Sequence, residues 1–196
     1  MRIGIGREGL LQEGEVREVV ARAAAALDRR WRRILVLVPD GTRTMPLPFL
    51  AALLEEELGP ATDALDFLVA LGTHRPMTDE QLSRLFGRPV KNGRMGRSRV
   101  FNHSSAPEAL TRVGTIPASE VAEITGGLLS EEVPVRVNRL VLDYDATLVL
   151  GPVFPHEVVG FSGGNKYFFP GIAGPEVINL TPWLGALISS YEVIGS

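Results

Sequence analysis

Hydrophobic residues recur at helical spacing in the amino-terminal half of the chain. The pattern predicts an amphipathic helix over Glu15–Trp31, with its apolar positions at Val16, Val19, Val20, Ala23 and Leu27. Leucines at similar spacing predict a second helix over Phe49–Leu58, which Gly59-Pro60 would end. A third, short helix is predicted after Thr78, because Thr78 and Gln81 match a capping box.

Continuous aliphatic runs separate these helices. Ile34–Val38 and Leu65–Leu71 are typical of strands buried on both faces of a parallel sheet, and Ala146–Leu150 predicts another strand. Val135–Tyr144 fits either a helix or an extended segment, and an apolar segment follows the glycine-rich stretch and runs to Leu187. Shorter strands are predicted over Val100–His103, Thr111–Ile116 and Val121–Ile124.

Alternation of strands and helices predicts the fold class. We expect one α/β domain over residues 1–196, with a mainly parallel, Rossmann-like sheet and helices on both faces, because parallel neighbours need crossover connections. Ligands of such sheets bind beyond the carboxyl ends of the strands. Three loops are therefore expected to form a site: Pro39–Thr44, Gly72–Pro76 and Pro152–Lys166.

Composition excludes several classes of site. The 196 residues include no cysteine, which removes disulfide frameworks, thiolate metal sites and cysteine nucleophiles. A net charge of −3 gives no support to nucleic-acid binding, although Lys91–Arg99 is basic and is interpreted as a solvated loop over an anion site. No apolar run approaches the ~20 residues that span a bilayer. We expect a cytoplasmic protein without nucleic-acid or membrane partners.

Two of the three histidines follow predicted strands. His74 and His156 lie in turns where side chains face the crevice, whereas His103 is interpreted as a structural, hydrogen-bonded side chain. An ordinary histidine pKa of about 6.5 suits proton transfer near neutral pH. Two histidines that face one pocket can serve opposite faces of a substrate.

Charged residues of the first and third loops are candidates for binding anions. Asp40 and Arg43 form either a local ion pair in a turn or a site for an oxyanion, with Asp40 holding the guanidinium in place. Gly160–Lys166 lacks the residues of a Walker A loop around its lysine, and no histidine follows Ser162 as a nucleophile elbow requires. Lys166 then remains as an anion clamp, a covalent anchor or a solvated surface lysine.

Four motifs together resemble the amino-terminal domain of the nickel-dependent lactate racemase family. They are DGTR at Asp40–Arg43, GTHRPMT at Gly72–Thr78, PHEVVGFSGGNK at Pro155–Lys166 and PGIAG at Pro170–Gly174, and the resemblance covers nearly the whole chain. Members of the family act on 2-hydroxy acids with a nickel-pincer nucleotide, which accepts a hydride from C2 of the substrate. The resemblance therefore implies a 2-hydroxy acid racemase or epimerase.

The resemblance also implies roles for individual residues. Lys166 would tether the cofactor through a thioamide, and His74 and His156 would be the paired catalytic acid and base. Arg43 would also bind the substrate. The further cofactor-binding residues implied are Asp40, Arg43, Thr42, Gly163 and Gly164.

Two features of the chain depart from the family. Trp183 lies near the position of a histidine that ligates nickel in the family, and an indole N–H is no metal ligand, so no metal ligand is assigned. Members of the family also have a second domain that closes over the substrate. We expect that domain to be absent from these 196 residues, the isolated domain to be inactive, and the cofactor-synthesis enzymes to be partners.

Two alternatives remain open. The first is a nickel-free anion- or nucleotide-binding enzyme such as a dehydrogenase, although no Gly-x-Gly-x-x-Gly follows the first strand. The second is a non-catalytic binding module that has kept the pocket and lost its metal, which Trp183 suggests.

Overall fold

A five-stranded sheet forms the centre of the protein. The computed structural model describes residues 4, 9–156, 160–178 and 180. The sheet order is β3-β4-β2-β1-β7, and every pair is parallel except β3 with β4. The four parallel strands follow the Rossmann order, which confirms the predicted α/β fold. The strands are β1 (Arg33–Val38), β2 (Ala64–Val69), β3 (Arg94–Met95), β4 (Ser98–Asn102) and β7 (Ala146–Val149).

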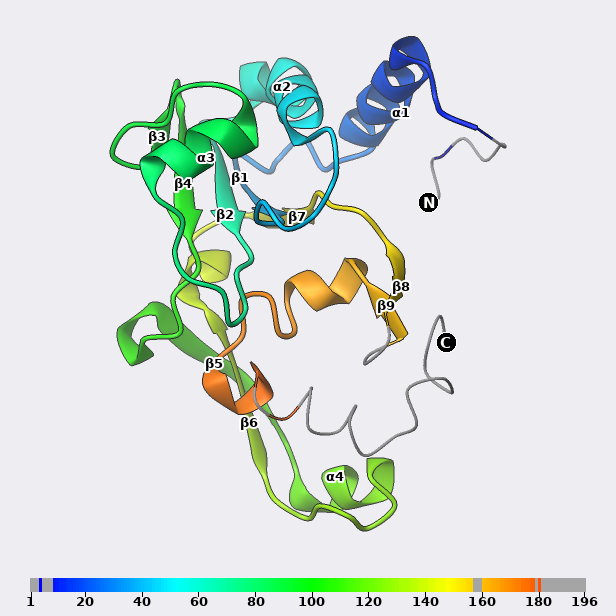
Figure 1. The fold of residues 1–196 in the computed structure, drawn as a ribbon, viewed down its shortest axis with the longest axis vertical. Helices are drawn as coiled ribbons and strands as arrows, with labels where there is room; N and C mark the ends of the chain where they lie inside the picture. The colour runs from blue at the N-terminus through cyan, green and yellow to red at the C-terminus, as the bar shows by residue number, and fades with distance from the viewer. Residues whose placement is uncertain (1–3, 5–8, 157–159, 179, 181–196) are drawn as a thin grey trace.

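Helical segments cover both faces of this sheet. Helices α1 (Glu13–Ala25), α2 (Leu47–Leu58) and α3 (Asp79–Phe86) lie together on one side of it (Figure 1). Consecutive side chains of β1 point to opposite faces of the sheet: Val36 belongs to the apolar cluster on one face and Leu37 to the cluster on the other. The second face is covered by the 3₁₀ helices η3 (Arg139–Leu142) and η4 (Gly164–Tyr167), through Leu140, Val141, Tyr167 and Phe168.

Helices and core strands agree with the sequence patterns, with differences at their ends. The first helix ends at Ala25, and Leu27 and Trp31 pack on the core from the segment that follows. The predicted capping box is present: the Thr78 hydroxyl accepts from the Gln81 N–H at 3.3 Å, and Gln81 Oε1 accepts from the Thr78 N–H at 2.8 Å. The stretch Val135–Tyr144 is part strand and part 3₁₀ helix.

The strand predicted over Val121–Ile124 is wrong. These residues belong to helix α4 (Ala118–Ile124), in which only Val121 is buried. Three apolar residues within a stretch of four do not distinguish a strand from a helical turn, and the helix here begins directly after Pro117.

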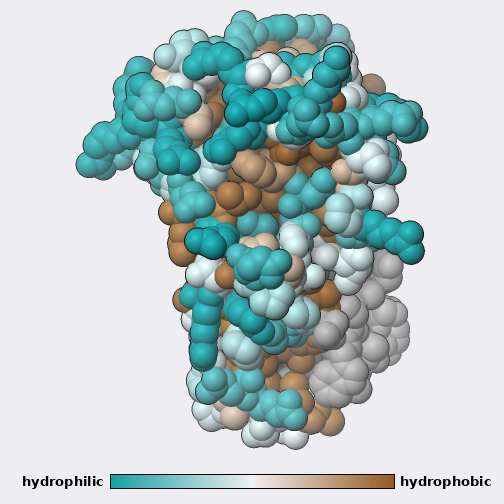
Figure 2. Space-filling model, turned by 90° about the vertical axis from the view of Figure 1, so that its left-hand side faces the viewer, coloured by the Kyte–Doolittle hydropathy of each residue, from teal (hydrophilic) through white to brown (hydrophobic). Residues whose placement is uncertain are grey.

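The basic stretch Lys91–Arg99, predicted as a loop, forms a hairpin. It contains β3 and the start of β4, with Asn92 and Gly93 at positive φ in the preceding turn. Lys91, Arg94 and Arg97 are exposed as predicted, whereas Arg99 is partly buried and pairs with Asp66. Figure 2 shows this side of the molecule, where hydrophilic side chains cover the upper part.

Two antiparallel ribbons complete the described structure. Strands β5 (Leu110–Ile116) and β6 (Val133–Asn138) extend away from the sheet, with α4 at their far end (Figure 1). Strands β8 (Phe154–His156) and β9 (Gly160–Ser162) form a hairpin after β7. Most of the apolar segment predicted up to Leu187 lies outside the described residues. Within the described part, no helix combines the length and apolar character needed to cross a membrane.

Candidate functional site

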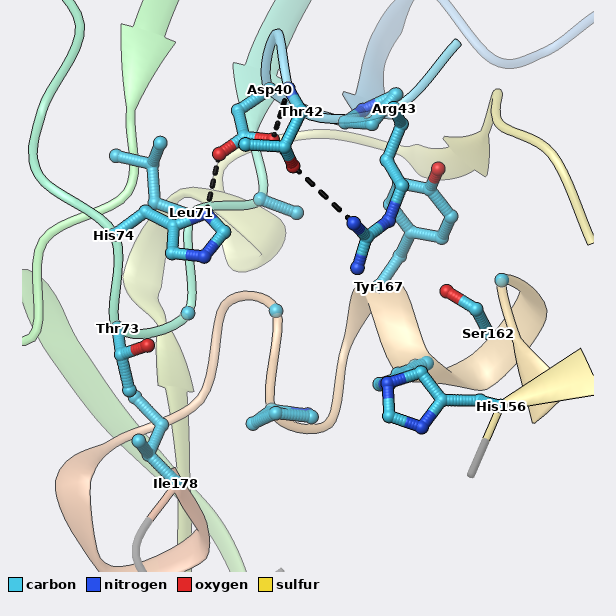
Figure 3. Close-up of a pocket in the computed structure, with 17 residues that line it drawn as sticks. Asp40, Thr42, Arg43, Leu71, Thr73, His74, His156, Ser162, Tyr167 and Ile178 are labelled. Carbon is cyan, nitrogen blue, oxygen red and sulfur yellow. Dashed lines mark hydrogen bonds and ion pairs between the residues drawn. The ribbon is translucent and has the colours of Figure 1, made fainter. Parts of the chain in front are cut away.

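A cavity of about 300 Å³ lies beyond the carboxyl ends of β1 and β2. All three loops predicted to form a site contribute to it, and the segment after η4 closes it (Figure 3). The cavity therefore lies where ligands bind in open α/β sheets. Its lining residues of predicted function are Asp40, Thr42, Arg43, His74, His156, Gly163 and Lys166.

Asp40 and His74 are in close polar contact in the cavity. His74 Nδ1 lies 2.5 Å from Asp40 Oδ2, and the Thr42 hydroxyl donates to Asp40 Oδ1 at 2.5 Å. The Thr42 N–H also donates to Oδ1, at 3.1 Å. Both oxygens of the carboxylate thus have partners, and Figure 3 shows the imidazole ring of His74 at the edge of the cavity.

Hydrogen bonds keep Asp40 ionised. Burial raises the pKa of Asp40, but hydrogen bonds from Thr42 and His74 outweigh burial, and the pKa lies below its ordinary value of 3.8. An ionised carboxylate at Nδ1 requires the ring to carry a proton on that nitrogen. In the neutral ring, Nε2 is then a proton acceptor, and the 51% exposure of the side chain leaves it accessible.

Arg43 points into the cavity without pairing with Asp40. Its guanidinium lies 3.4 Å from the Thr42 hydroxyl and 5.7 Å from the centre of the Phe154 ring. The hypothesis that Asp40 holds the guanidinium is therefore wrong, because the carboxylate is occupied by Thr42 and His74. Arg43 is placed to meet an anionic group in the cavity (Figure 3).

A tight glycine turn brings Lys166 to the cavity wall. Gly163 has φ 95°, and a Cβ there would lie 2.3 Å from the Pro152 carbonyl oxygen, so only glycine fits. The turn continues into η4, which contains Lys166. Lys166 is partly buried and lines the cavity, whereas Gly164 is exposed and is not among the lining residues.

Several lining residues were missed by sequence reasoning. Tyr167 is buried beneath the cavity, and burial together with the nearby Asp40 raises its pKa to about 12, against the opposing charge of Arg43. Thr73, Ser162 and Ile178 also line the cavity. Ser162 was considered only as a nucleophile. The position of Tyr167 directly after Lys166 was the only local signal for it.

The remaining candidates lie elsewhere. His103 is buried outside the cavity and hydrogen-bonded, which agrees with its structural interpretation. Trp183 lies outside the described residues. Among the described residues, no three histidine, aspartate or glutamate side chains gather in a way that could hold a metal ion.

Comparison with protein families identifies the chain. The family model for the lactate racemase N-terminal domain matches residues 16–182. The chain belongs to this family. The lactate racemase of Thermoanaerobacterium thermosaccharolyticum is 26% identical over 180 residues, which are 90% of this chain and 38% of that protein. The lactate racemase of Lactiplantibacillus plantarum is 29% identical over 154 residues, 78% of this chain and 32% of that protein.

Solved structures share the fold of this lactate racemase N-terminal domain. A crystal structure of a Thermotoga maritima protein superposes with a TM-score of 0.84 at 35% identity, over 95% of this chain and 44% of that one. The lactate racemase apoprotein of T. thermosaccharolyticum gives a TM-score of 0.61 at 24% identity, over 83% of this chain and 38% of that one. The chain thus spans about a third to two fifths of the curated relatives' length.

Proposed function

We propose that this domain binds a nickel-pincer nucleotide and supplies the acid and base of a 2-hydroxy acid racemase or epimerase. The observation that carries the proposal is that His74, His156 and Lys166, from three separate segments, line one cavity. Membership of the lactate racemase N-terminal domain family supports it.

The residues of the cavity suit such a cofactor. Lys166 offers an amine for covalent attachment, and Arg43 offers a guanidinium for a phosphate. Gly163, which no larger residue can replace, maintains the tight turn that brings Lys166 to the cavity. Thr42 and Asp40 complete the proposed set that lines the cavity, and Gly164 belongs to the same glycine turn as Gly163.

The nucleotide, when bound, supplies an acceptor for the hydride of C2. His74 takes the proton of the substrate hydroxyl at Nε2, and the carboxylate of Asp40 stabilises the resulting imidazolium. Arg43 binds the substrate carboxylate. His156 performs the same proton transfer for the opposite enantiomer. The 2-keto acid between them is planar at C2, which permits inversion.

A lysine-specific mass measurement tests cofactor attachment. The full-length protein is produced together with the cofactor-synthesis enzymes and digested, and an adduct is expected on the peptide with Lys166. Lys91, the only other lysine of these 196 residues, supplies the control. Lys166→Ala should abolish the adduct, and Lys91→Ala should leave it intact.

Stereochemical assays test the reaction itself. Each enantiomer of a panel of 2-hydroxy acids is incubated with the loaded full-length protein, and chiral chromatography follows the appearance of the other enantiomer. His74→Ala, His156→Ala and Asp40→Asn should each lower the rate by about 10²-fold or more. A protein that carries the adduct but inverts no acid would contradict the racemase proposal. Nucleotide binding without an adduct would favour the non-catalytic alternative.

A further inference from the structure

His103 is almost fully buried, at 3% exposure, and both of its ring nitrogens have partners. Nε2 lies 3.1 Å from the carbonyl oxygen of Ala173, and Nδ1 lies 3.3 Å from Asn138 Nδ2. The backbone N–H of His103 donates to the Val69 carbonyl at the end of β2, at 3.1 Å. One side chain therefore joins the sheet, the β5–β6 ribbon and the segment that follows Lys166.

The partners of His103 determine where its ring carries a proton. A carbonyl oxygen only accepts hydrogen bonds, so Nε2 is the protonated nitrogen. Nδ1 then accepts from the Asn138 amide, whose Oδ1 already accepts from the Leu140 N–H at 3.1 Å and fixes the orientation of that amide. Burial lowers the pKa of His103, which keeps the ring in this neutral form.

The segment bound by His103 forms part of the cavity wall. Pro170 and Gly171 line the cavity, and the Gly171 carbonyl accepts from the Gly72 N–H, in the loop that carries His74, at 2.9 Å. The Gly171 N–H donates to the Lys166 carbonyl at 3.0 Å. A displacement of Ala173 would thus alter how the Lys166 segment meets the His74 loop.

We propose that His103 is a positioning residue, whose hydrogen bond from Nε2 to Ala173 holds the Lys166–Ala173 segment in register with the His74 loop. The consequence for catalysis rests on the proposed function, but the positioning itself does not. β6 supports the same segment, because Asn138 N–H donates to the Ile172 carbonyl at 2.8 Å and Gly174 N–H donates to the Arg136 carbonyl at 2.8 Å. His103 adds the contact that comes from the sheet.

Two isosteric substitutions separate the two bonds of the ring. The amide nitrogen of His103→Gln reaches the position of Nε2 and keeps a donor for Ala173. The side chain of His103→Asn reaches only the position of Nδ1, so it keeps the Asn138 contact and loses the Ala173 bond. Both variants are polar and neutral, which makes them matched controls for each other.

Hydrogen exchange at the Gly72 amide measures the positioning directly in the full-length protein without cofactor. We expect about tenfold faster exchange in His103→Asn than in the wild type, and exchange close to the wild-type rate in His103→Gln. Equal exchange in the two variants would overturn the proposal. Nitrogen NMR shifts of the wild-type protein should show His103 protonated at Nε2. Protonation at Nδ1 would also overturn the proposal, and this measurement does not depend on whether a variant folds.

Kinetics of the loaded protein then link positioning to the reaction. His103→Asn should lower kcat about tenfold with little change in KM, and His103→Gln should restore it. A loss of kcat that His103→Gln does not restore would contradict the positioning role. If the wild type inverts no substrate but Gly72 exchange responds as expected, the proposed function fails and the positioning role stands.

Discussion

The carboxylate of Asp40 is only 7% exposed, yet it ionises more readily than an ordinary aspartate. Its partners are a hydroxyl, a backbone N–H and an imidazole, and all three donate to the ionised form. Hydrogen bonds from neighbouring side chains thus outweigh the cost of burial. The same bonds that orient the ring of His74 also stabilise the fold.

Asp40 should make stability depend on pH. Because its pKa is lowered on folding, it stabilises the protein above its ordinary pKa of 3.8, and this contribution is lost as pH falls through the lower folded value. Thermal unfolding should show Asp40→Asn melting a few degrees below the wild type at pH 5 to 7. The difference in melting temperature between Asp40→Asn and the wild type should become smaller below about pH 4. A difference that stays constant down to pH 3 would contradict the assignment, and the exposed Asp143→Asn serves as the control.

Gly151 packs closely against the ring of Tyr167 beneath the cavity. A Cβ on Gly151 would lie 2.8 Å from Tyr167 Cε2 and closer still to its hydroxyl oxygen. Gly151→Ala should therefore destabilise the protein by about 1–3 kcal/mol in urea unfolding. In a Tyr167→Leu background the same substitution should cost clearly less, because the obstructing ring is gone. An equal cost in both backgrounds would show that Tyr167 is not the obstacle. Gly114→Ala, which meets nothing within 4 Å, is the control.

The sequence predicted individual polar residues of the site, but it did not predict the apolar residues that line the cavity. Asp40, His74 and Lys166 stand out because a charged or titratable side chain directly after a buried strand, or in a glycine turn, has no role in a core. Tyr167 and Ile178 resemble ordinary core residues, and only the folded chain shows that they also face the cavity. The partner of Asp40 was likewise unpredictable, since His74 lies 34 residues away in the sequence, whereas Arg43 is in the same turn.

At the scale of elements, the local capping signal located the start of α3, whereas the predicted end of the first helix at Trp31 was wrong, since α1 ends at Ala25. The capping box at Thr78 involves backbone and side chains within four residues, so it forms as soon as the helix does. Helix α4 was missed because its apolar run is short and its single buried residue gives no period. The sequence patterns therefore did not predict whether a short element is a helix or a strand when that depends on burial by distant segments.

Removing the cap of α3 should weaken the element that follows the His74 loop. Thr78→Ala deletes the hydroxyl that accepts from the Gln81 N–H, at a cost of about 0.5–2 kcal/mol in denaturant unfolding. Thr78→Ser keeps the hydroxyl and should stay close to the wild type. If Thr78→Ser loses as much as Thr78→Ala, the methyl group rather than the cap accounts for the loss.

The arrangement of the whole molecule follows from long-range contacts without a local signal. The chain leaves the sheet to form the β5–β6 ribbon and then returns, so that β7 pairs beside β1. The backbone N–H groups of Arg32 and Arg33, at the start of β1, donate to the Asp145 carboxylate just before β7. The α/β order predicted that the loops would meet, because parallel strands place their carboxyl ends at one edge. It did not predict the segment from Pro170 to Ile178 that closes the cavity.

A buried carboxylate joins three distant parts of the molecule and should dominate its stability. Asp66 in β2 is 2% exposed and accepts from Arg99 Nε at 3.0 Å, from the Arg99 N–H at 2.6 Å and from the Tyr144 hydroxyl at 2.6 Å. Arg99→Met leaves the carboxylate buried without its cation, but the Arg99 side chain is 42% exposed, so the expected cost in denaturant unfolding is about 1–3 kcal/mol.

The cost of Arg99→Met should depend on the charge of Asp66. Adding Asp66→Asn to Arg99→Met should recover part of the lost stability, because an uncharged amide needs no cation. Its oxygen can accept from the backbone N–H of residue 99, and its N–H can donate to the Tyr144 hydroxyl oxygen. Arg84→Met, which breaks the exposed pair with Glu80, should cost less than about 1 kcal/mol. Two results would contradict this role of the buried charge: equal losses of stability in Arg84→Met and Arg99→Met, or no recovery of stability in the double variant. Either result would mean that packing of the arginine side chain accounts for the loss.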